Sequence, residues 1–238
     1  MIEFSGVTKY YDQDIVLKDV SVNIDKAEMV FLTGPSGAGK TTLLKLIYCS
    51  EKPDEGHIVV AGWDIRKLKQ RTIPFLRRNL GIVFQDFRLL KNKTVFENVA
   101  LALRIHDMHP DEIKEDVHEV LKDVKLAHKS NTYPEHLSGG EQQRIVIARA
   151  MVTKPTVLLA DEPTGNLDSK TSREIISLFD KLNRERNLTV ILVTHDREVA
   201  RYARRTIVLR DGMVICDTAS FDEALKSLHS SEEYQADS

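Results

Sequence analysis

The stretch Gly34-Pro35-Ser36-Gly37-Ala38-Gly39-Lys40-Thr41 follows the apolar run Met29–Thr33 and precedes leucines at helical spacing. It matches the pattern G-x-x-x-x-G-K-[ST], in which a glycine-rich loop between a strand and a helix wraps backbone amides around phosphates. In this pattern the lysine reaches the β- and γ-phosphates, and the last hydroxyl coordinates Mg²⁺. A plain glycine turn is the alternative, but chance produces the pattern in on the order of one in a hundred chains of this length. We therefore predict that Lys40 and Thr41 bind a nucleotide.

A second apolar run, at residues 156–160, ends in the neighbouring carboxylates Asp161 and Glu162. Ligands of α/β folds bind at the edge of the sheet where parallel strands end. We predict that Asp161 holds Mg²⁺ and that Glu162 orients or deprotonates an attacking water, a step that contributes roughly 10²- to 10⁴-fold in rate. Carboxylates at a strand end often only cap the next turn, so the catalytic interpretation depends on the glycine loop.

The apolar patterns around these motifs predict an α/β domain. Residues 2–24 contain short β-branched pieces broken by polar turns, which predict antiparallel strands. Residues 156–160 and 188–193 are apolar throughout, which suits parallel strands covered on both faces, and residues 169–183 predict the crossover helix between them. Helical spacing dominates residues 94–154, which we interpret as an inserted helical subdomain.

Composition excludes several classes of function. The 238 residues carry a formal net charge of −2, so they provide no general positive field, and we do not expect a nucleic acid partner. The two cysteines, Cys49 and Cys216, argue against a disulfide framework or a zinc site. No apolar run approaches the roughly 20 residues that cross a bilayer. If the protein works at a membrane, we expect another chain to span it.

A second glycine-rich loop, Leu137-Ser138-Gly139-Gly140-Glu141-Gln142, also precedes a helical pattern. One phosphate loop suffices for one nucleotide. The second loop is therefore either an ordinary helix cap or a contact to a nucleotide held by another subunit.

These motifs together resemble those of the ATP-binding-cassette (ABC) ATPase family, and the resemblance covers nearly the whole chain. It implies a P-loop NTPase (RecA-like) α/β core with an antiparallel β subdomain and an inserted α-helical subdomain. The expected boundaries are 1–90 and 155–228 for the core, 91–154 for the helical subdomain and 229–238 for a polar tail. The resemblance also implies an ATP-dependent homodimer in which the signature loop of each subunit, residues 137–142, binds the γ-phosphate of the other subunit's ATP.

Four further positions match the family's pattern. Gln85 resembles the glutamine that senses Mg²⁺ and the attacking water, and His195 the histidine that contacts the γ-phosphate and holds the catalytic glutamate. Asp168 resembles a residue of the dimer interface, although it could equally cap the following helix. Tyr11 resembles the aromatic residue that stacks on adenine, and Tyr10 is the competing assignment.

The resemblance thus implies three sets of site residues. The catalytic residues are Glu162, His195, Gln85 and Lys40. The residues that bind ATP are Tyr11, Gly34, Pro35, Ser36, Gly37, Ala38, Gly39, Lys40, Thr41, Thr42, Ser138, Gly139, Gly140 and Asp168. The Mg²⁺ ligands are Thr41, Gln85 and Asp161.

Within the ABC family, the segments at residues 31–34, 75–86 and 89–90 resemble the FtsE subfamily of cell-division ATPases. This resemblance implies a membrane partner like FtsX, a location on the cytoplasmic face of the inner membrane, and control of cell-wall hydrolases. Phe87, Leu89 and Leu90 lie where family members receive a membrane partner, although ordinary packing would also explain them. The alternative is the ATPase subunit of a lipoprotein-releasing or macrolide-type exporter.

Overall fold

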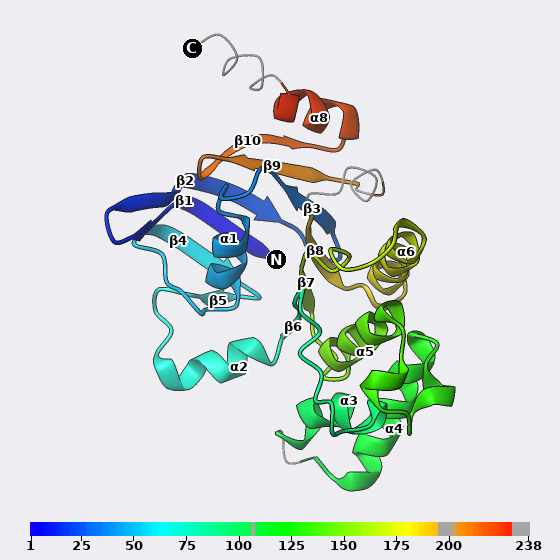
Figure 1. Ribbon diagram of the computed structural model, residues 1–238. Helices are drawn as coiled ribbons and strands as arrows, with labels where there is room; N and C mark the ends of the chain where they lie inside the picture. The colour runs from blue at the N-terminus through cyan, green and yellow to red at the C-terminus, as the bar shows by residue number, and fades with distance from the viewer. Residues whose placement is uncertain (106–107, 195–201, 203, 230–238) are drawn as a thin grey trace.

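Two β-sheets and the helices around them form the computed structural model, which describes residues 1–105, 108–194, 202 and 204–229 (Figure 1). The larger sheet has the strand order β10-β9-β3-β8-β7-β6, and the smaller has the order β2-β1-β4-β5. This is the mixed α/β architecture that the sequence predicts, with a parallel sheet beside an antiparallel one.

The larger sheet carries the strands that end at the predicted site. Its parallel strands and the antiparallel edge strand β10 have these bounds: β3 Met29–Thr33, β6 Leu80–Val83, β7 Val157–Asp161, β8 Thr189–Val193, β9 Thr206–Arg210 and β10 Met213–Thr218. Strand β8 lies between β3 and β7, so the carboxyl ends of all three meet at one edge. The strand before the glycine loop and the strand that ends in two carboxylates therefore converge.

The smaller sheet is antiparallel and comprises β1 (Ile2–Tyr11), β2 (Asp14–Ile24), β4 (Glu55–Val60) and β5 (Trp63–Asp64). The strands predicted within residues 2–24 correspond to β1 and β2. The sequence patterns do not predict β4 or β5. Strand β4 begins with Glu, Gly and His, and β5 has only two residues, so neither shows a clear apolar alternation.

Seven α-helices have bounds within the described residues: α1 Lys40–Ile47, α2 Ile73–Arg77, α3 Val95–Arg104, α4 Pro110–Asp123, α5 Gly139–Met151, α6 Ser169–Arg186 and α8 Phe221–His229. The predicted crossover helix is α6, which continues three residues beyond the predicted end and stops where Asn187 adopts a left-handed conformation. Helices α3, α4 and α5 gather on one side of the molecule, and α8 lies near the opposite end (Figure 1). None of the helices within the described ranges is long and apolar enough to span a membrane.

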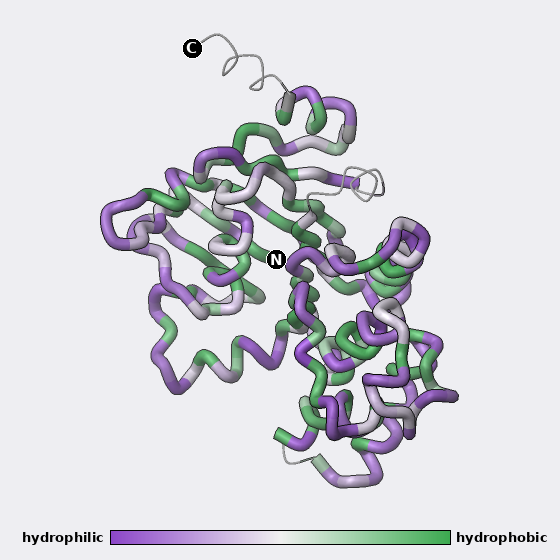
Figure 2. Tube along the Cα trace, viewed as in Figure 1, coloured by the Kyte–Doolittle hydropathy of each residue, from purple (hydrophilic) through white to green (hydrophobic). Residues whose placement is uncertain are grey.

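Two hydrophobic cores lie on opposite faces of the larger sheet. Because strand side chains alternate between faces, Met29 and Phe31 of β3 join helices α3 to α6, whereas Val30 and Leu32 join α1 and the smaller sheet. Figure 2 shows the resulting concentration of apolar residues along the central strands. The core that contains α3 and α4 is continuous with the sheet, so the helices of residues 91–154 are packed onto the parallel strands.

Candidate nucleotide-binding site

The glycine loop takes a backbone conformation that requires glycine at defined positions. Gly34 has a φ of 147°, and a Cβ atom there would lie 2.0 Å from the carbonyl oxygen of Leu209. Gly39 has a φ of 97° and immediately precedes α1, where a Cβ atom would lie 2.8 Å from the carbonyl oxygen of Val16. The motif thus forms a tight turn that delivers the amino-terminal end of α1 to the carboxyl edge of the sheet, where unpaired amides favour an anion.

Lys40 lies folded over this loop. Its ammonium donates hydrogen bonds to the carbonyl oxygens of Gly34, at 2.8 Å, and Pro35, at 2.7 Å. The residue is only 8% exposed, and this burial lowers the pKa of the ammonium, while the charges of Glu162 and Asp161 oppose the shift. A buried cation beside two carboxylates and a ring of backbone amides is suited to a polyphosphate.

Thr41 and Asp161 converge from different elements at the side of the loop. The Thr41 hydroxyl donates to the Asp161 carboxylate at 3.3 Å, which joins the first turn of α1 to the end of β7. Burial raises the pKa of Asp161, although the bond from Thr41 and the charge of Lys40 act in the opposite direction. A hydroxyl and a carboxylate are the hard oxygen donors that Mg²⁺ prefers, so these residues fit that ion. Within the described part of the chain, no group of three or more His, Cys, Asp or Glu could hold a metal.

Glu162 follows Asp161 with an unusual backbone. Its φ of 48° is left-handed, and its amide donates to the carbonyl oxygen of Val193 at 3.0 Å. This bond ties the residue to the end of β8, and the side chain lines the same cleft as Lys40. A non-glycine residue held in this conformation costs free energy that the surrounding contacts must offset, and such residues cluster at functional sites.

The cleft above the glycine loop has a volume of 640 Å³. Its lining comes from the loop, the start of α1, Glu162 and Val16: Val16, Gly34, Pro35, Ser36, Gly37, Gly39, Lys40, Thr41, Thr42 and Glu162. Val16 was not predicted from the sequence. It lies on β2, far from every motif, and only the approach of β2 to Gly39 places it there.

The two tyrosines of β1 are not in the lining of this cleft. The Tyr11 ring lies 5.5 Å from the Lys9 ammonium and 5.9 Å from that of Lys45, which is on α1. The Tyr11 hydroxyl is buried and has no hydrogen-bond partner among the described residues. The Tyr10 amide donates to Asp54 at 2.8 Å. Tyr11 therefore sits beside the helix that follows the glycine loop, and its stacking role stays a prediction.

The second glycine loop is built as a helix cap. The Ser138 hydroxyl donates to the Glu141 carboxylate at 2.9 Å and also accepts from the Glu141 amide, so the two residues form a capping box at the start of α5. Lys129 pairs with Glu141, and this pair lowers the pKa of the carboxyl, with further help from the Ser138 amide. A Cβ atom on Gly140 would lie 2.4 Å from the Thr171 methyl of α6, so α5 approaches α6 closely.

Gln85 contacts the segment between β7 and α6, and Asp168 is the last residue of that segment. The Asn166 side chain donates to the Gln85 carbonyl oxygen at 3.3 Å, and a Cβ atom on Gly165 would lie 3.0 Å from the Gln85 amide nitrogen. Asp168 caps α6 by accepting from the amides of Lys170 and Thr171, each at 3.0 Å. The capping alternative for Asp168 is therefore present in this chain, and its interface role stays a prediction. His195 lies outside the described residues.

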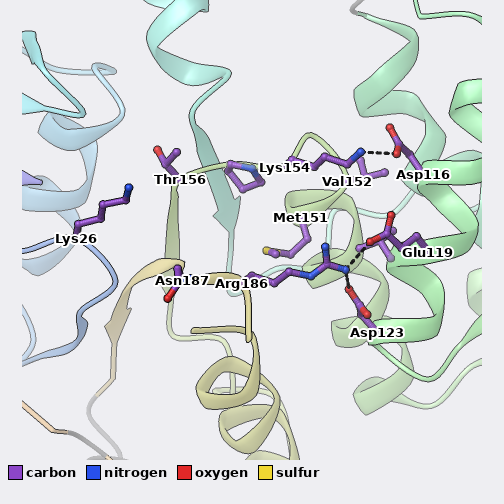
Figure 3. Close-up of a pocket in the computed structure, with 12 residues that line it drawn as sticks. Lys26, Asp116, Glu119, Asp123, Met151, Val152, Lys154, Thr156, Arg186 and Asn187 are labelled. Atoms are coloured by element: carbon purple, nitrogen blue, oxygen red, sulfur yellow. Dashed lines mark hydrogen bonds and ion pairs between the residues drawn. The ribbon is translucent and has the colours of Figure 1, made fainter. Parts of the chain in front are cut away.

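A second cavity lies at the other end of the parallel strands. It has a volume of 390 Å³ and lies among α4, the end of α6 and the start of β7 (Figure 3). Lys154 pairs with Asp116 at 2.7 Å, and Arg186 pairs with Glu119 at 2.7 Å and with Asp123 at 2.6 Å. These charges neutralise one another, so the cavity presents no convergent set of free catalytic groups among its described lining residues.

Comparisons with known proteins identify the same family that the sequence motifs resemble. Residues 17–165 match the family model described as ABC transporter. The cell division ATP-binding protein FtsE of Bacillus subtilis is 47% identical over 219 residues, which cover 91% of this chain and 96% of the relative. FtsE of Escherichia coli is 49% identical over 214 residues, which cover 89% and 96%.

Two solved structures have similar folds. An ATP-binding cassette solved as a dimer in a post-hydrolysis state, bound to ADP and Pi, is 40% identical with a TM-score of 0.82, and the match covers 92% of this chain and 98% of that one. A cassette of Clostridium perfringens that is part of the ABC transporter complex cbiONQ is 28% identical with a TM-score of 0.88. That match covers 99% of this chain and 94% of the other.

Proposed function

Because this chain belongs to the ABC transporter family, and within it to the cell division ATP-binding proteins named FtsE, we propose that it couples ATP hydrolysis to cell division as a homodimer on a membrane partner. It is an ABC-type ATP hydrolase, since the family model and the ADP-bound neighbour both match it closely. The relatives named above are cell division proteins, so the exporter alternative is not favoured.

The observation that carries the proposal is the convergence of three strand ends on one cleft. Lys40, Thr41, Asp161 and Glu162 meet at the carboxyl ends of β3 and β7, although 120 residues separate Thr41 from Asp161. This set combines a buried cation, two oxygen donors for Mg²⁺ and a carboxylate positioned by β8. It is the combination that phosphoryl transfer to water needs.

Each residue then has a role toward bound ATP. The loop amides and Lys40 bind the phosphates, while Thr41 and Asp161 hold Mg²⁺, directly or through water, with Gln85 as the further ligand. Mg²⁺ supplies neutralisation of charge on the β- and γ-phosphates. Glu162 orients the attacking water and accepts its proton, and His195 supports Glu162. The place of Glu162 in the lining of the phosphate cleft supports this role.

Dimerisation explains the second glycine loop. The lining of the phosphate cleft contains no residue of α5 or of the signature loop. We infer that Ser138, Gly139 and Gly140 of one subunit close over the γ-phosphate held by Lys40 of the other, with Asp168 near the interface. The amino-terminal end of α5 offers unpaired amides for this contact. A similar cassette has been solved as a dimer bound to ADP and Pi, which supports a nucleotide-bound dimer.

The membrane partner in this proposal resembles FtsX and places the dimer on the cytoplasmic face of the inner membrane. Leu90 is 42% exposed, and Phe87 and Leu89 pack only partly against the core, so the segment after Gln85 offers an apolar contact for that partner. We propose that the core comprises residues 1–90 and 155–228 and the helical subdomain residues 91–154. This segment then lies at the junction of the two. ATP-driven closure would then pass to the regulation of cell-wall hydrolases.

The experiment that tests the ATPase assignment compares the wild type with Glu162→Gln. Glu162→Gln should reduce phosphate release by at least about 100-fold, because the attacking water loses its base, yet retain ATP binding. Size-exclusion light scattering should show a dimer of Glu162→Gln with ATP and a monomer without it. Glu115→Gln, an exposed carboxylate on α4, is the matched control and should behave as the wild type.

Wild-type turnover by Glu162→Gln would contradict the role of Glu162. A monomer of Glu162→Gln both with and without ATP would contradict self-assembly of the isolated chain. The membrane partner would then be needed to align the two halves, and co-purification with that partner would be the next measurement.

A further inference from the structure

The segment that joins the smaller sheet to β6 is strongly basic. Residues 65–85 contain no Asp or Glu, in a chain whose formal net charge is −2. Their six cationic side chains, all exposed, are Arg66, Lys67, Lys69, Arg71, Arg77 and Arg78. We call the surface formed by residues 66–78 the basic surface.

Most of these cations have no local carboxylate to neutralise them. Lys67 pairs with Asp64 at 3.0 Å, and Arg77 is held by the carbonyl oxygens of Tyr48 and Cys49. Among the described residues, Lys69 and Arg71 have no ion pair. The positive charge of the basic surface is therefore available to a partner.

An exposed aromatic ring accompanies the charges. Phe75 on α2 is 50% exposed, and the Arg78 guanidinium lies 4.9 Å from the centre of its ring. Ile73 and Leu76 of the same short helix are buried and attach it to the hydrophobic core that contains α1 and the smaller sheet. Helix α2 is thus anchored from beneath, while Phe75 and the cations face solvent.

We propose that the basic surface binds the anionic lipid surface of a membrane, independently of any protein partner. Clusters of Lys and Arg are attracted to anionic headgroups, and an aromatic ring is favoured at the boundary between headgroups and acyl chains. The basic surface combines both features within residues 66–78. None of the chemistry assigned to the phosphate cleft uses these residues.

The shape of the segment favours a lipid surface over an acidic protein segment. None of the six cations lines the phosphate cleft or the cavity of Figure 3. In Figure 1, α2 projects below the smaller sheet, and Figure 2 shows hydrophilic positions on both sides of it. A projecting segment with dispersed charge suits a fluid charged plane, which needs no complementary groove.

The basic surface also lies near the segment assigned to the membrane partner. Seven residues, 78–84, separate the end of α2 from Gln85, and four of them form the strand β6. At roughly 3.3 Å per residue, this strand spans about 13 Å. One bilayer could therefore contact the basic surface while a membrane protein occupied the segment at Phe87 and Leu90.

The single tryptophan of the chain provides a specific reporter. Trp63 lies on β5, three residues before Arg66. The nucleotide-free protein would be mixed with phosphatidylcholine vesicles, with or without phosphatidylglycerol, that carry a trace of dansyl-labelled lipid. We expect energy transfer from Trp63 to dansyl only with phosphatidylglycerol, and we expect added salt to weaken it.

Substitutions then locate the contact. Lys69→Gln/Arg71→Gln should weaken vesicle binding about fivefold per charge, and so roughly 20- to 30-fold for the pair at low salt. Phe75→Ala should weaken it severalfold with little change in salt dependence. The control is Lys114→Gln/Lys122→Gln, which removes two exposed charges from α4 and should bind as the wild type. All variants should keep basal ATP turnover, which also reports folding.

Three results would overturn the proposal. Neutral and anionic vesicles could bind the protein equally, Lys69→Gln/Arg71→Gln could bind anionic vesicles as well as the wild type does, or the protein could bind them without energy transfer from Trp63 to dansyl. Saturable binding to polyglutamate, without binding to anionic vesicles, would assign the basic surface to an acidic protein instead. The assay needs neither ATP nor a membrane protein, so its outcome is separate from that of the dimerisation experiment.

Discussion

Either of the two adjacent tyrosines at the end of β1 could stack on the adenine of bound ATP. Tyr10 and Tyr11 both follow Lys9, and the Tyr11 ring lies 5.9 Å from the Lys45 ammonium of α1. The Tyr11 hydroxyl has no hydrogen-bond partner among the described residues, so Tyr11→Phe would keep the ring and break no hydrogen bond. The two residues can therefore be separated by substitution.

Tyr11→Ala should weaken ATP affinity by about 5- to 150-fold, the equivalent of the roughly 1–3 kcal/mol that base stacking contributes. Tyr11→Phe should preserve the affinity, because it retains the ring. Tyr10→Ala should have little effect. Equilibrium binding of a fluorescent ATP analogue measures all three, and a larger loss in Tyr10→Ala than in Tyr11→Ala would reverse the assignment.

Substitution of Thr41 tests the proposed Mg²⁺ site. Thr41→Val keeps the shape of the side chain but removes the hydroxyl that faces Asp161. It should raise the Mg²⁺ concentration needed for half-maximal turnover by at least about tenfold. Thr41→Ser retains the hydroxyl and should stay near the wild type. An unchanged Mg²⁺ dependence in Thr41→Val would remove Thr41 from the ligand set.

At the amino-terminal end of α5, one residue, Glu141, takes part in both the helix cap and an ion pair. Glu141 accepts from Ser138 and pairs with Lys129, and these contacts lower the pKa of its carboxyl below the ordinary value of 4.5. The folded chain therefore binds this proton less tightly than the unfolded chain does. The stabilisation is complete above about pH 4.5 and is lost as the pH falls through the lower, folded value.

Glu141→Gln should consequently lower the free energy of unfolding near neutral pH by about 0.5–1 kcal/mol, since glutamine can keep the cap but not the ion pair. The difference from the wild type should shrink as the pH falls below about 4.5. Urea unfolding midpoints across a pH series measure it. A difference that stays constant with pH would mean that the charge of Glu141 contributes nothing.

For the whole molecule, the ion pairs of the cavity in Figure 3 attach α4 to the core. Arg186 at the end of α6 reaches Glu119 and Asp123, and Lys154 before β7 reaches Asp116. The same region shares one hydrophobic core with the parallel sheet. The partly exposed ion pairs therefore contribute modestly to an attachment that apolar packing dominates.

Arg186→Met should speed amide hydrogen exchange in α4 and lower the stability by no more than about 1 kcal/mol. Exchange in β7 and β8 should speed up by no more than the loss of global stability requires, because their contacts are retained. Arg184→Met, which removes a pair within α6, is the control and should leave α4 protected. Unchanged exchange in α4 of Arg186→Met would show that packing alone holds the helix.

The sequence determined the features that depend on residues close together in the chain. Gly34 and Gly39 have positive φ values and no room for a Cβ atom, so the motif specifies the turn between β3 and α1. The apolar runs before Asp161 and Thr194 likewise determine β7 and β8. The family resemblance and the predicted fold class rest on these local signals.

Only the tertiary structure decided which distant groups share the cleft. Val16 lines it because β2 passes Gly39, and Thr41 meets Asp161 because β8 pairs with both β3 and β7. Neither approach leaves a local pattern, since each depends on how strands far apart in the chain are ordered. The weakly patterned β4 and β5 also form through their neighbours, because β4 pairs with β1 and β5 in turn pairs with β4.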